Sequence, residues 1–239
     1  MSASGGTVLQ HQLVLFDIDG TLVVTGGAGQ RAMNLAFHDV FGVADAFIGI
    51  DLAGRTDTSI VADAFARQRM SADANALASF RARYLERLRE EVPRPGPGKR
   101  VLPGIAPLLD ALEPHPQTFL GLLTGNFADA AEVKLAHFDL WRYFRCGAFG
   151  EDAHDRNHLV PVALDRARGR GLPDHVDAGQ TVVIGDTPRD IACARAHGAR
   201  VVAVATGEYS VEALEDADVV FADFSDTQAV LAALGVRRC

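Results

Sequence analysis

The sequence of 239 residues has a formal net charge of −8, with 48% hydrophobic and 23% charged residues, a composition typical of a globular protein. The acidic balance argues against nucleic-acid binding, and no apolar run approaches the roughly 20 residues that cross a bilayer. The start of the chain lacks the apolar segment of a signal peptide, and the three cysteines lack C-x-x-C spacing. We therefore expect a cytoplasmic protein.

Five short apolar runs are typical of buried parallel strands, because each is too short for a helix and most are rich in Val, Leu or Ile. They are Leu13–Phe16, Phe119–Leu123, Thr181–Ile184, Arg200–Val204 and Val219–Phe221. Helical patterns lie between them, such as the apolar stripe within residues 105–112. This alternation predicts an α/β fold with a doubly wound parallel sheet.

One long stretch, from about residue 26 to residue 92, interrupts the alternation. It contains no predicted strand, and three of its segments have apolar residues at helical spacing. These segments are Met33–Phe41, Ile60–Phe65 and Leu77–Leu88. The segment Pro93–Gly98 follows and cannot continue a helix. We expect an all-helical insertion at 25–98 within a core formed by 1–24 and 99–239.

A pair of carboxylates, Asp17 and Asp19, directly follows the first predicted strand in the sequence Phe16-Asp17-Ile18-Asp19-Gly20-Thr21. Ligands bind beyond the carboxyl ends of strands in open parallel sheets. Two neighbouring carboxylates repel each other and usually need a cation or a shared proton, and oxygen ligands of this kind suit Mg²⁺. The alternative is a solvated turn, which is common where Asp and Gly cluster.

A second acidic cluster follows the third predicted strand. Asp186 is placed to bind a metal, and Asp190, one helical turn later, to orient Asp186 or a metal-bound water. Capping of the next helix by Asp186 is the alternative. Two acidic strand ends in one parallel sheet disfavour capping as the whole explanation.

Thr124, Gly125 and Asn126 follow the second predicted strand. The Thr124 hydroxyl and the following backbone N–H groups would hold phosphate oxygens near a helix N-terminus. An ordinary strand-to-helix turn is the alternative interpretation of these residues.

Together these motifs resemble the haloacid dehalogenase superfamily. Asp17-Ile18-Asp19-Gly20-Thr21 resembles its first motif, D-x-D-x-T, and Thr124 resembles the Ser or Thr of its second. Gly185-Asp186 with Asp190 resembles the fourth motif, G-D-x-x-x-D, and the order and spacing match across nearly the whole chain. The helical insertion lies where the C1 cap of the phosphoglycolate phosphatase-like branch lies.

The third motif of the family is a Lys or Arg that balances charge around the nucleophile and the phosphate. Close relatives in that family often have Lys-Pro after the third strand of the family's sheet. The corresponding stretch here, residues 150–157, has no Lys-Pro. Arg156 is the first choice by position, and Lys134 on the preceding predicted helix is the second. One of the two is expected to act, because phosphoryl transfer depends on neutralising charge.

The resemblance implies a Mg²⁺-dependent phosphatase acting on a small-molecule phosphate ester. Asp17 would be the nucleophile that forms an aspartyl-phosphate, and Asp19 the acid and base. The metal set would be Asp17, Asp19 (through its backbone carbonyl), Asp186 and Asp190. Substrate contacts would come from Gly20, Thr124, Gly125, Asn126 and, in the cap, Arg55.

Two other functions remain open from the sequence: a sugar-phosphate mutase that uses the same Asp17 and Asp19, and a binding protein that kept the fold. Two further patterns are set aside. The G-x-G-x-x-A pattern of Gly27–Ala32 does not directly follow the first strand, as a dinucleotide site requires. His154 and His158 lie among acids, but a solvated loop explains them better than a metal patch does. The oligomeric state stays open.

Overall fold

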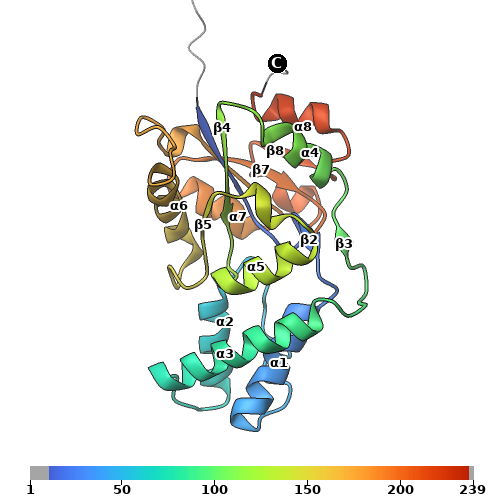
Figure 1. Ribbon diagram of the computed structural model, residues 1–239, viewed down its shortest axis with the longest axis vertical. Coiled ribbons are helices and arrows are strands. Elements are labelled where there is room, and N and C mark those ends of the chain that lie inside the picture. Colours follow the sequence, from blue (N-terminus) through green and yellow to red (C-terminus); the bar gives the residue numbers. More distant parts are fainter. Residues whose placement is uncertain (1–10, 237–239) are drawn as a thin grey trace, which may run out of the picture.

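The computed structural model describes residues 11–236. Residues 1–10, which carry the expectation about a signal peptide, and Cys239 lie outside the described residues. Six parallel strands form the main sheet in the order β5-β4-β1-β6-β7-β8 (Figure 1). The strands are β1 (Gln12–Phe16), β4 (Thr118–Leu123), β5 (Cys146–Ala148), β6 (Thr181–Gly185), β7 (Arg200–Val204) and β8 (Val219–Phe221). The doubly wound prediction is confirmed, since the chain adds β4 and β5 on one side of β1 and β6 to β8 on the other.

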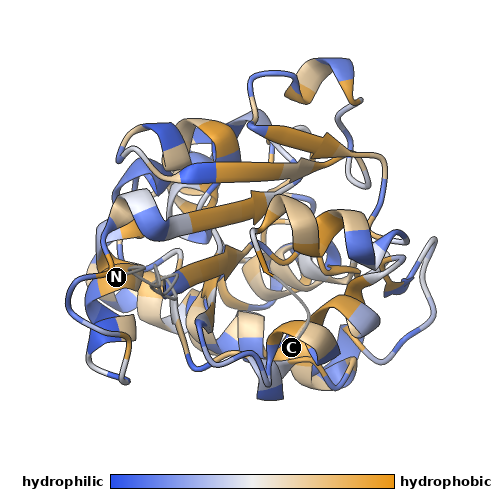
Figure 2. Cartoon of the chain, turned by 90° about the horizontal axis from the view of Figure 1, so that it is seen from above, coloured by the Kyte–Doolittle hydropathy of each residue, from blue (hydrophilic) through white to orange (hydrophobic). Residues whose placement is uncertain are grey.

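Helices cover both faces of this sheet. They are α4 (Ile105–Leu112), α5 (Ala128–His137), α6 (Leu159–Arg168), α7 (Pro188–Arg195) and α8 (Thr227–Ala233). Side chains alternate along each strand, so Val14 and Phe16 of β1 pack with α4, α5 and α8 on one face. Leu13 and Leu15 pack with α6 and α7 on the other. The strands are therefore almost continuously hydrophobic, as Figure 2 shows.

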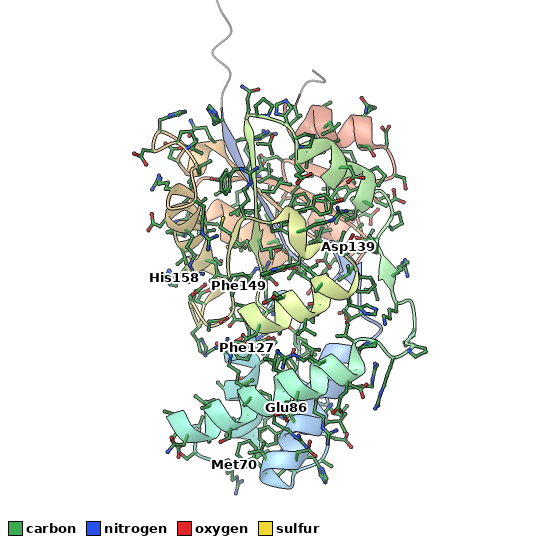
Figure 3. The ribbon with its side chains drawn as sticks, viewed as in Figure 1. Met70, Glu86, Phe127, Asp139, Phe149 and His158 are labelled. Carbon is green, nitrogen blue, oxygen red and sulfur yellow. The ribbon has the colours of Figure 1, made fainter. Side chains whose placement is uncertain are left out.

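Three helices, α1 (Ala28–Phe41), α2 (Asp57–Arg67) and α3 (Ala74–Glu91), form the part of the chain below the sheet in Figure 1. They enclose an apolar cluster of their own, in which Phe37 contacts Phe65 and Phe80 edge-on at centroid distances of 5.1 and 6.0 Å. Phe127, at the start of α5, joins this cluster from the sheet side (Figure 3). The helical stripes of the sequence thus pack against each other and against one end of the sheet domain.

The two connections between the helical part and the sheet lie side by side. A small antiparallel ladder joins β2 (Val23–Val24) to β3 (Arg100–Val101), which the sequence did not predict because each strand has two residues. Next to the ladder, Gly26 and Gly96 approach closely, and a Cβ at Gly96 would lie 2.6 Å from the Gly26 carbonyl oxygen. Both glycines are therefore needed for the crossing of the two connections.

No helix within residues 11–236 has both the length and the hydrophobicity needed to cross a membrane.

Candidate active site

Three neighbouring strands end in the polar residues that the sequence singled out. Asp17 follows β1, Thr124 follows β4 and Asp186 follows β6, and β4-β1-β6 is the order of these strands in the sheet. The Asp17 N–H donates to the Ile184 carbonyl at 2.9 Å, which fixes the first residue after β1 against the end of β6. All three side chains line one cavity of about 410 Å³ between the sheet and the helical part, a size common for small-molecule sites.

Asp17 lines this cavity and is buried, with 4% of its surface exposed. The Arg156 guanidinium lies 3.1 Å from its carboxylate and also pairs with Asp190. Hydrogen bonds from Arg156 to the carbonyl oxygens of Leu123 (3.1 Å) and Gly54 (3.2 Å) hold the guanidinium in place. Burial raises the pKa of Asp17 to about 6, although Arg156 opposes the rise.

Asp190 pairs with Arg156 and also accepts hydrogen bonds at the start of its own helix, α7. Its carboxylate accepts hydrogen bonds from the Thr187 N–H at 3.0 Å and the Thr187 hydroxyl at 2.7 Å, and its other oxygen faces Arg156. Thr187, rather than Asp186, caps α7, so the capping alternative for Asp186 does not hold. Both Asp190 oxygens already have partners, which suits a residue that orients Arg156.

Asp186 is enclosed by small and polar groups. The Thr21 hydroxyl donates to it at 3.0 Å. A Cβ at Gly20 or at Gly207 would overlap with the Asp186 carboxylate, and Gly20 also has a φ of +83°. The two glycines therefore allow the backbone to approach this carboxylate closely.

The arrangement of buried acids fits a divalent cation. Carboxylate oxygens of Asp17, Asp186 and Asp190 lie within 4.8 Å of one another. Burial, together with the negative charges of Asp190 and Asp17, raises the pKa of Asp186 well above its ordinary value. Arg156 brings one positive charge to three carboxyl groups, so a hard cation would relieve the remaining repulsion. These three buried acids thus form a triad whose composition and spacing suit a metal ion.

The Asp19 side chain is not part of this triad. Its carboxylate lies 2.5 Å from the Lys134 ammonium and accepts a hydrogen bond from the Asn126 side chain at 2.9 Å. Lys134 also donates to the side-chain amide oxygen of Asn126 at 2.6 Å, and the Asn126 side-chain amide donates to the Thr124 hydroxyl at 2.8 Å. A continuous polar network therefore runs from Asp19 to Thr124, and Lys134 and Arg156 serve different acids.

The N-terminus of α5 is partly occupied by other groups. The Phe127 N–H donates to the carboxylate of Asp57, a residue of α2, at 2.9 Å, and the Ala128 N–H donates to Glu151 at 3.0 Å. These two N–H groups are already paired, so a phosphate held at this end has to use the groups nearer Thr124.

The helical part supplies Arg55 and Asp57 to the cavity wall. The Arg55 guanidinium, in the loop before α2, is already paired with Asp63 of α2 at 2.7 Å. Asp57 is buried, and this burial raises its pKa to about 7, although Lys134 opposes the rise. Its N–H donates to the Gly125 carbonyl at 2.6 Å, so α2 begins in direct contact with the sheet domain.

The family model for haloacid dehalogenase-like hydrolases matches residues 14–204. The chain belongs to the haloacid dehalogenase-like hydrolase family. It is 32% identical over 219 residues to a phosphoglycolate phosphatase of Rhodospirillum rubrum, covering 89% of this chain and 87% of that protein. It is 29% identical over 225 residues to the probable phosphatase IndB of Dickeya dadantii, covering 90% of each.

The fold of this haloacid dehalogenase-like chain also has solved counterparts. A protein described as a predicted phosphoglycolate phosphatase from Haemophilus somnus superposes with a TM-score of 0.67 at 19% identity, covering 94% of this chain and 99% of that one. The family match and the Rhodospirillum rubrum relative confirm the resemblance inferred from the motifs, and this likeness in fold confirms the α/β core.

Several residues of the cavity in this haloacid dehalogenase-like chain were not singled out from the sequence for a site. Tyr84 lies within the apolar helical stripe Leu77–Leu88, and neither Asp57 nor Gly207 was given a role. For Gly207 a sequence signal exists, since it follows β7 at the same edge of the sheet. Within residues 11–236, His154 and His158 do not join any group of three or more possible metal ligands.

Proposed function

We propose that this chain is a Mg²⁺-dependent phosphatase that hydrolyses a small phosphorylated metabolite through an aspartyl-phosphate on Asp17. The observation that carries the proposal is that Asp17, Asp19, Thr124 and Asp186 line one cavity. Asp17 pairs there with Arg156, Asp19 pairs with Lys134, and Asp186 lies next to Asp17. The names of the two relatives, a phosphoglycolate phosphatase and a probable phosphatase, support the same reaction class.

In the proposed reaction, a carboxylate oxygen of Asp17 attacks phosphorus while the bond from phosphorus to the leaving oxygen breaks. Asp19 gives a proton to that oxygen, and later removes a proton from the water that cleaves the aspartyl-phosphate. A positioned acid and base of this kind typically contributes about 10²–10⁴-fold. Lys134 orients Asp19 for both steps, because it holds the carboxylate at 2.5 Å.

The phosphoryl oxygens are assigned to Thr124 and to the backbone around Gly20 and Gly125. Arg156 lies against the nucleophile and balances its charge. Asp17, Asp186 and the backbone carbonyl of Asp19 are the proposed ligands of Mg²⁺, and Asp190 supports the site through Arg156. When bound, the ion neutralises negative charge as an anionic nucleophile approaches an anionic phosphate.

We further propose that residues 25–98 act as a cap on a core formed by 1–24 and 99–239. The Asp57 N–H bond to Gly125 and the bond from the Thr56 hydroxyl to the His154 carbonyl, at 2.9 Å, support a closed arrangement that excludes water. The adjacent connections at Gly26 and Gly96 are the positions where the cap would pivot.

The decisive experiment measures phosphate release from a panel of phosphate esters by wild-type protein and by the Asp17→Asn variant, with Mg²⁺ and with EDTA. Hydrolysis that requires both Asp17 and Mg²⁺ is the expected result. Interconversion of sugar phosphates with little phosphate release would instead indicate the mutase. Full activity of the Asp17→Asn variant would refute the assignment, and specific binding without turnover would indicate the non-enzymatic protein.

A further inference from the structure

The cavity wall contains a buried hydroxyl that the proposed mechanism does not use. Tyr84, on α3, is 1% exposed and lines the cavity. Its ring packs against Phe80 and Phe127 with centroid distances of 6.0 and 6.4 Å, which holds the side chain in one position. Within the described part of the chain, its hydroxyl oxygen has no hydrogen-bond partner. Leaving such a group unpaired costs free energy in a folded protein, so it needs an explanation.

The hydroxyl faces the end of the cavity next to Lys134. A Cβ at Gly29, the second residue of α1, would lie 3.5 Å from the Lys134 Nζ and 4.0 Å from the Tyr84 hydroxyl. Gly29 therefore leaves open the space that both groups border. Because Lys134 also holds Asp19, the proposed acid for the leaving oxygen, this space belongs to the leaving group rather than to the phosphate.

The charges around the cavity restrict what the leaving group can carry. Three cationic side chains are among the described residues that line it, and each is already paired with an acid. The pairs are Arg55 with Asp63 (2.7 Å), Lys134 with Asp19 (2.5 Å) and Arg156 with Asp17 (3.1 Å). The acids Asp57 and Glu208 line the cavity as well. A second anionic group on the substrate would therefore find acids but no uncommitted cation, which disfavours it.

Building on the proposed phosphatase function, we propose that Tyr84 is a specificity-determining residue whose hydroxyl donates a hydrogen bond to a neutral oxygen of the leaving group. The preferred substrates are then phosphate monoesters of polyhydroxy alcohols or sugars, rather than phosphorylated carboxylic acids. The Rhodospirillum rubrum relative is named for phosphoglycolate, whose leaving group carries a carboxylate, so the proposal predicts a different preference for this chain.

The test compares wild-type and Tyr84→Phe proteins on glycerol 3-phosphate, n-propyl phosphate and 2-phosphoglycolate, with Mg²⁺, by phosphate release. Wild type is expected to have the highest kcat/KM for glycerol 3-phosphate. Tyr84→Phe is expected to lower that value about five- to tenfold, the effect of one neutral hydrogen bond, and to leave n-propyl phosphate unchanged. The unfolding midpoint of the unliganded protein is expected to stay the same or rise, because the lost hydroxyl has no partner.

Tyr143→Phe is the matched control. Tyr143 is also buried, but its hydroxyl donates to Asp110 at 2.5 Å and accepts from Arg142 at 2.8 Å, away from the cavity. This variant is expected to lower the unfolding midpoint and to leave the ratio of kcat/KM values for the three substrates unchanged. A second variant, Gly29→Ala, keeps Tyr84 and Lys134 but fills the space between them, and is expected to reduce kcat/KM for glycerol 3-phosphate selectively.

Three results would overturn the proposal: an equal effect of Tyr84→Phe on all three substrates, no effect on any, or a wild-type preference for 2-phosphoglycolate. Binding of the same ligands to Asp17→Asn protein, measured by calorimetry with and without Tyr84→Phe, separates this proposal from the proposed reaction. If wild-type protein hydrolyses none of the substrates but glycerol 3-phosphate binds in a Tyr84-dependent way, the phosphatase function is refuted and the Tyr84 assignment is kept. Absent or Tyr84-independent binding would refute the Tyr84 assignment itself.

Discussion

The guanidinium of Arg156 lies 3.1 Å from the carboxylate of Asp17, and both side chains are buried. Arg156 begins a short 3₁₀ helix, Arg156–His158, and its side chain extends from there past the end of β4 to reach Asp17. The same guanidinium pairs with Asp190 on α7. A single Arg therefore connects the loop after β5 with the acids that follow β1 and β6.

Substitution of Arg156 is expected to affect both stability and activity. Arg156→Met leaves Asp17 and Asp190 without their cation in a buried site, a change that typically costs about 3–5 kcal/mol. Urea unfolding checks the stability and phosphate release the activity. Arg156→Lys keeps the charge but cannot pair with Asp17 and Asp190 in the same geometry, so this variant is expected to fold and to be less active than wild type.

Arg195→Met is the control, because it breaks a half-exposed pair with Asp218 and should change stability by less than about 1 kcal/mol. An equal loss of stability in both Met variants would contradict the argument.

Lys134 is expected to matter most for poor leaving groups. Lys134→Met removes the group that holds Asp19 at 2.5 Å, so proton donation to the leaving oxygen becomes less efficient. An alkyl phosphate needs that proton and should lose about tenfold or more in kcat, within the range of acid–base effects. 4-Nitrophenyl phosphate has a stable leaving group and should lose much less. Lys99→Met, directly after the segment Pro93–Gly98, is the control. Equal losses on both substrates would show that Lys134 does not act through Asp19.

The sequence predicted most of the sheet and most of the site residues, for reasons that are local. Asp17, Thr124 and Asp186 each follow a strongly apolar strand, and strand ends are easily recognised. The strand β5 was not predicted, because Cys146–Ala148 is short and has Gly at its centre. The choice between Arg156 and Lys134 was not decidable either, because it depends on which acid each long side chain reaches across the fold. Tyr84 has the spacing of a core residue, and only the packing shows that its hydroxyl faces a cavity.

Removal of the divalent cation is expected to destabilise the protein. With Mg²⁺ at about 100 times its dissociation constant, binding to the folded state alone would add about 2.7 kcal/mol. The apparent unfolding midpoint should therefore rise from EDTA to Mg²⁺ in wild type. Asp186→Asn should abolish this rise and the activity together, whereas Asp174→Asn, on the surface, should preserve both. A Mg²⁺-dependent rise of normal size in the Asp186→Asn variant would place the ion elsewhere.

Asp57 is expected to make the stability of the protein fall with rising pH. Burial raises its pKa from 3.8 to about 7, so between these values the folded chain keeps a proton that the unfolded chain has lost. Its contribution is most favourable below about pH 4 and is lost as the pH rises to about 7, by an amount on the order of 4 kcal/mol. Asp57→Asn removes the charge, and its side-chain oxygen can still accept from the Phe127 N–H. Urea unfolding at pH 5 and pH 8 in EDTA should show a smaller pH dependence for this variant than for wild type or for Asp63→Asn, at a half-exposed position on the same helix. An unchanged slope would mean that Asp57 titrates normally.

Contact between the cap and the core can be tested at Gly125. A Cβ at this position would overlap with the Arg55 carbonyl of the cap loop, and the Gly125 carbonyl accepts the hydrogen bond from the Asp57 N–H. Gly125→Ala is therefore expected to force the two parts to separate rather than to disrupt either one, because the overlapping atoms belong to different parts. The variant should keep a near-normal unfolding midpoint but lose about tenfold or more in kcat/KM, since closure excludes water and completes the site.

Gly169→Ala is the matched control, because its Cβ would lie at least 3.5 Å from its neighbours at the end of α6. If Gly125→Ala instead unfolds the protein while Gly169→Ala does not, Gly125 supports the core itself; if it leaves kcat/KM unchanged, this contact is not required for catalysis.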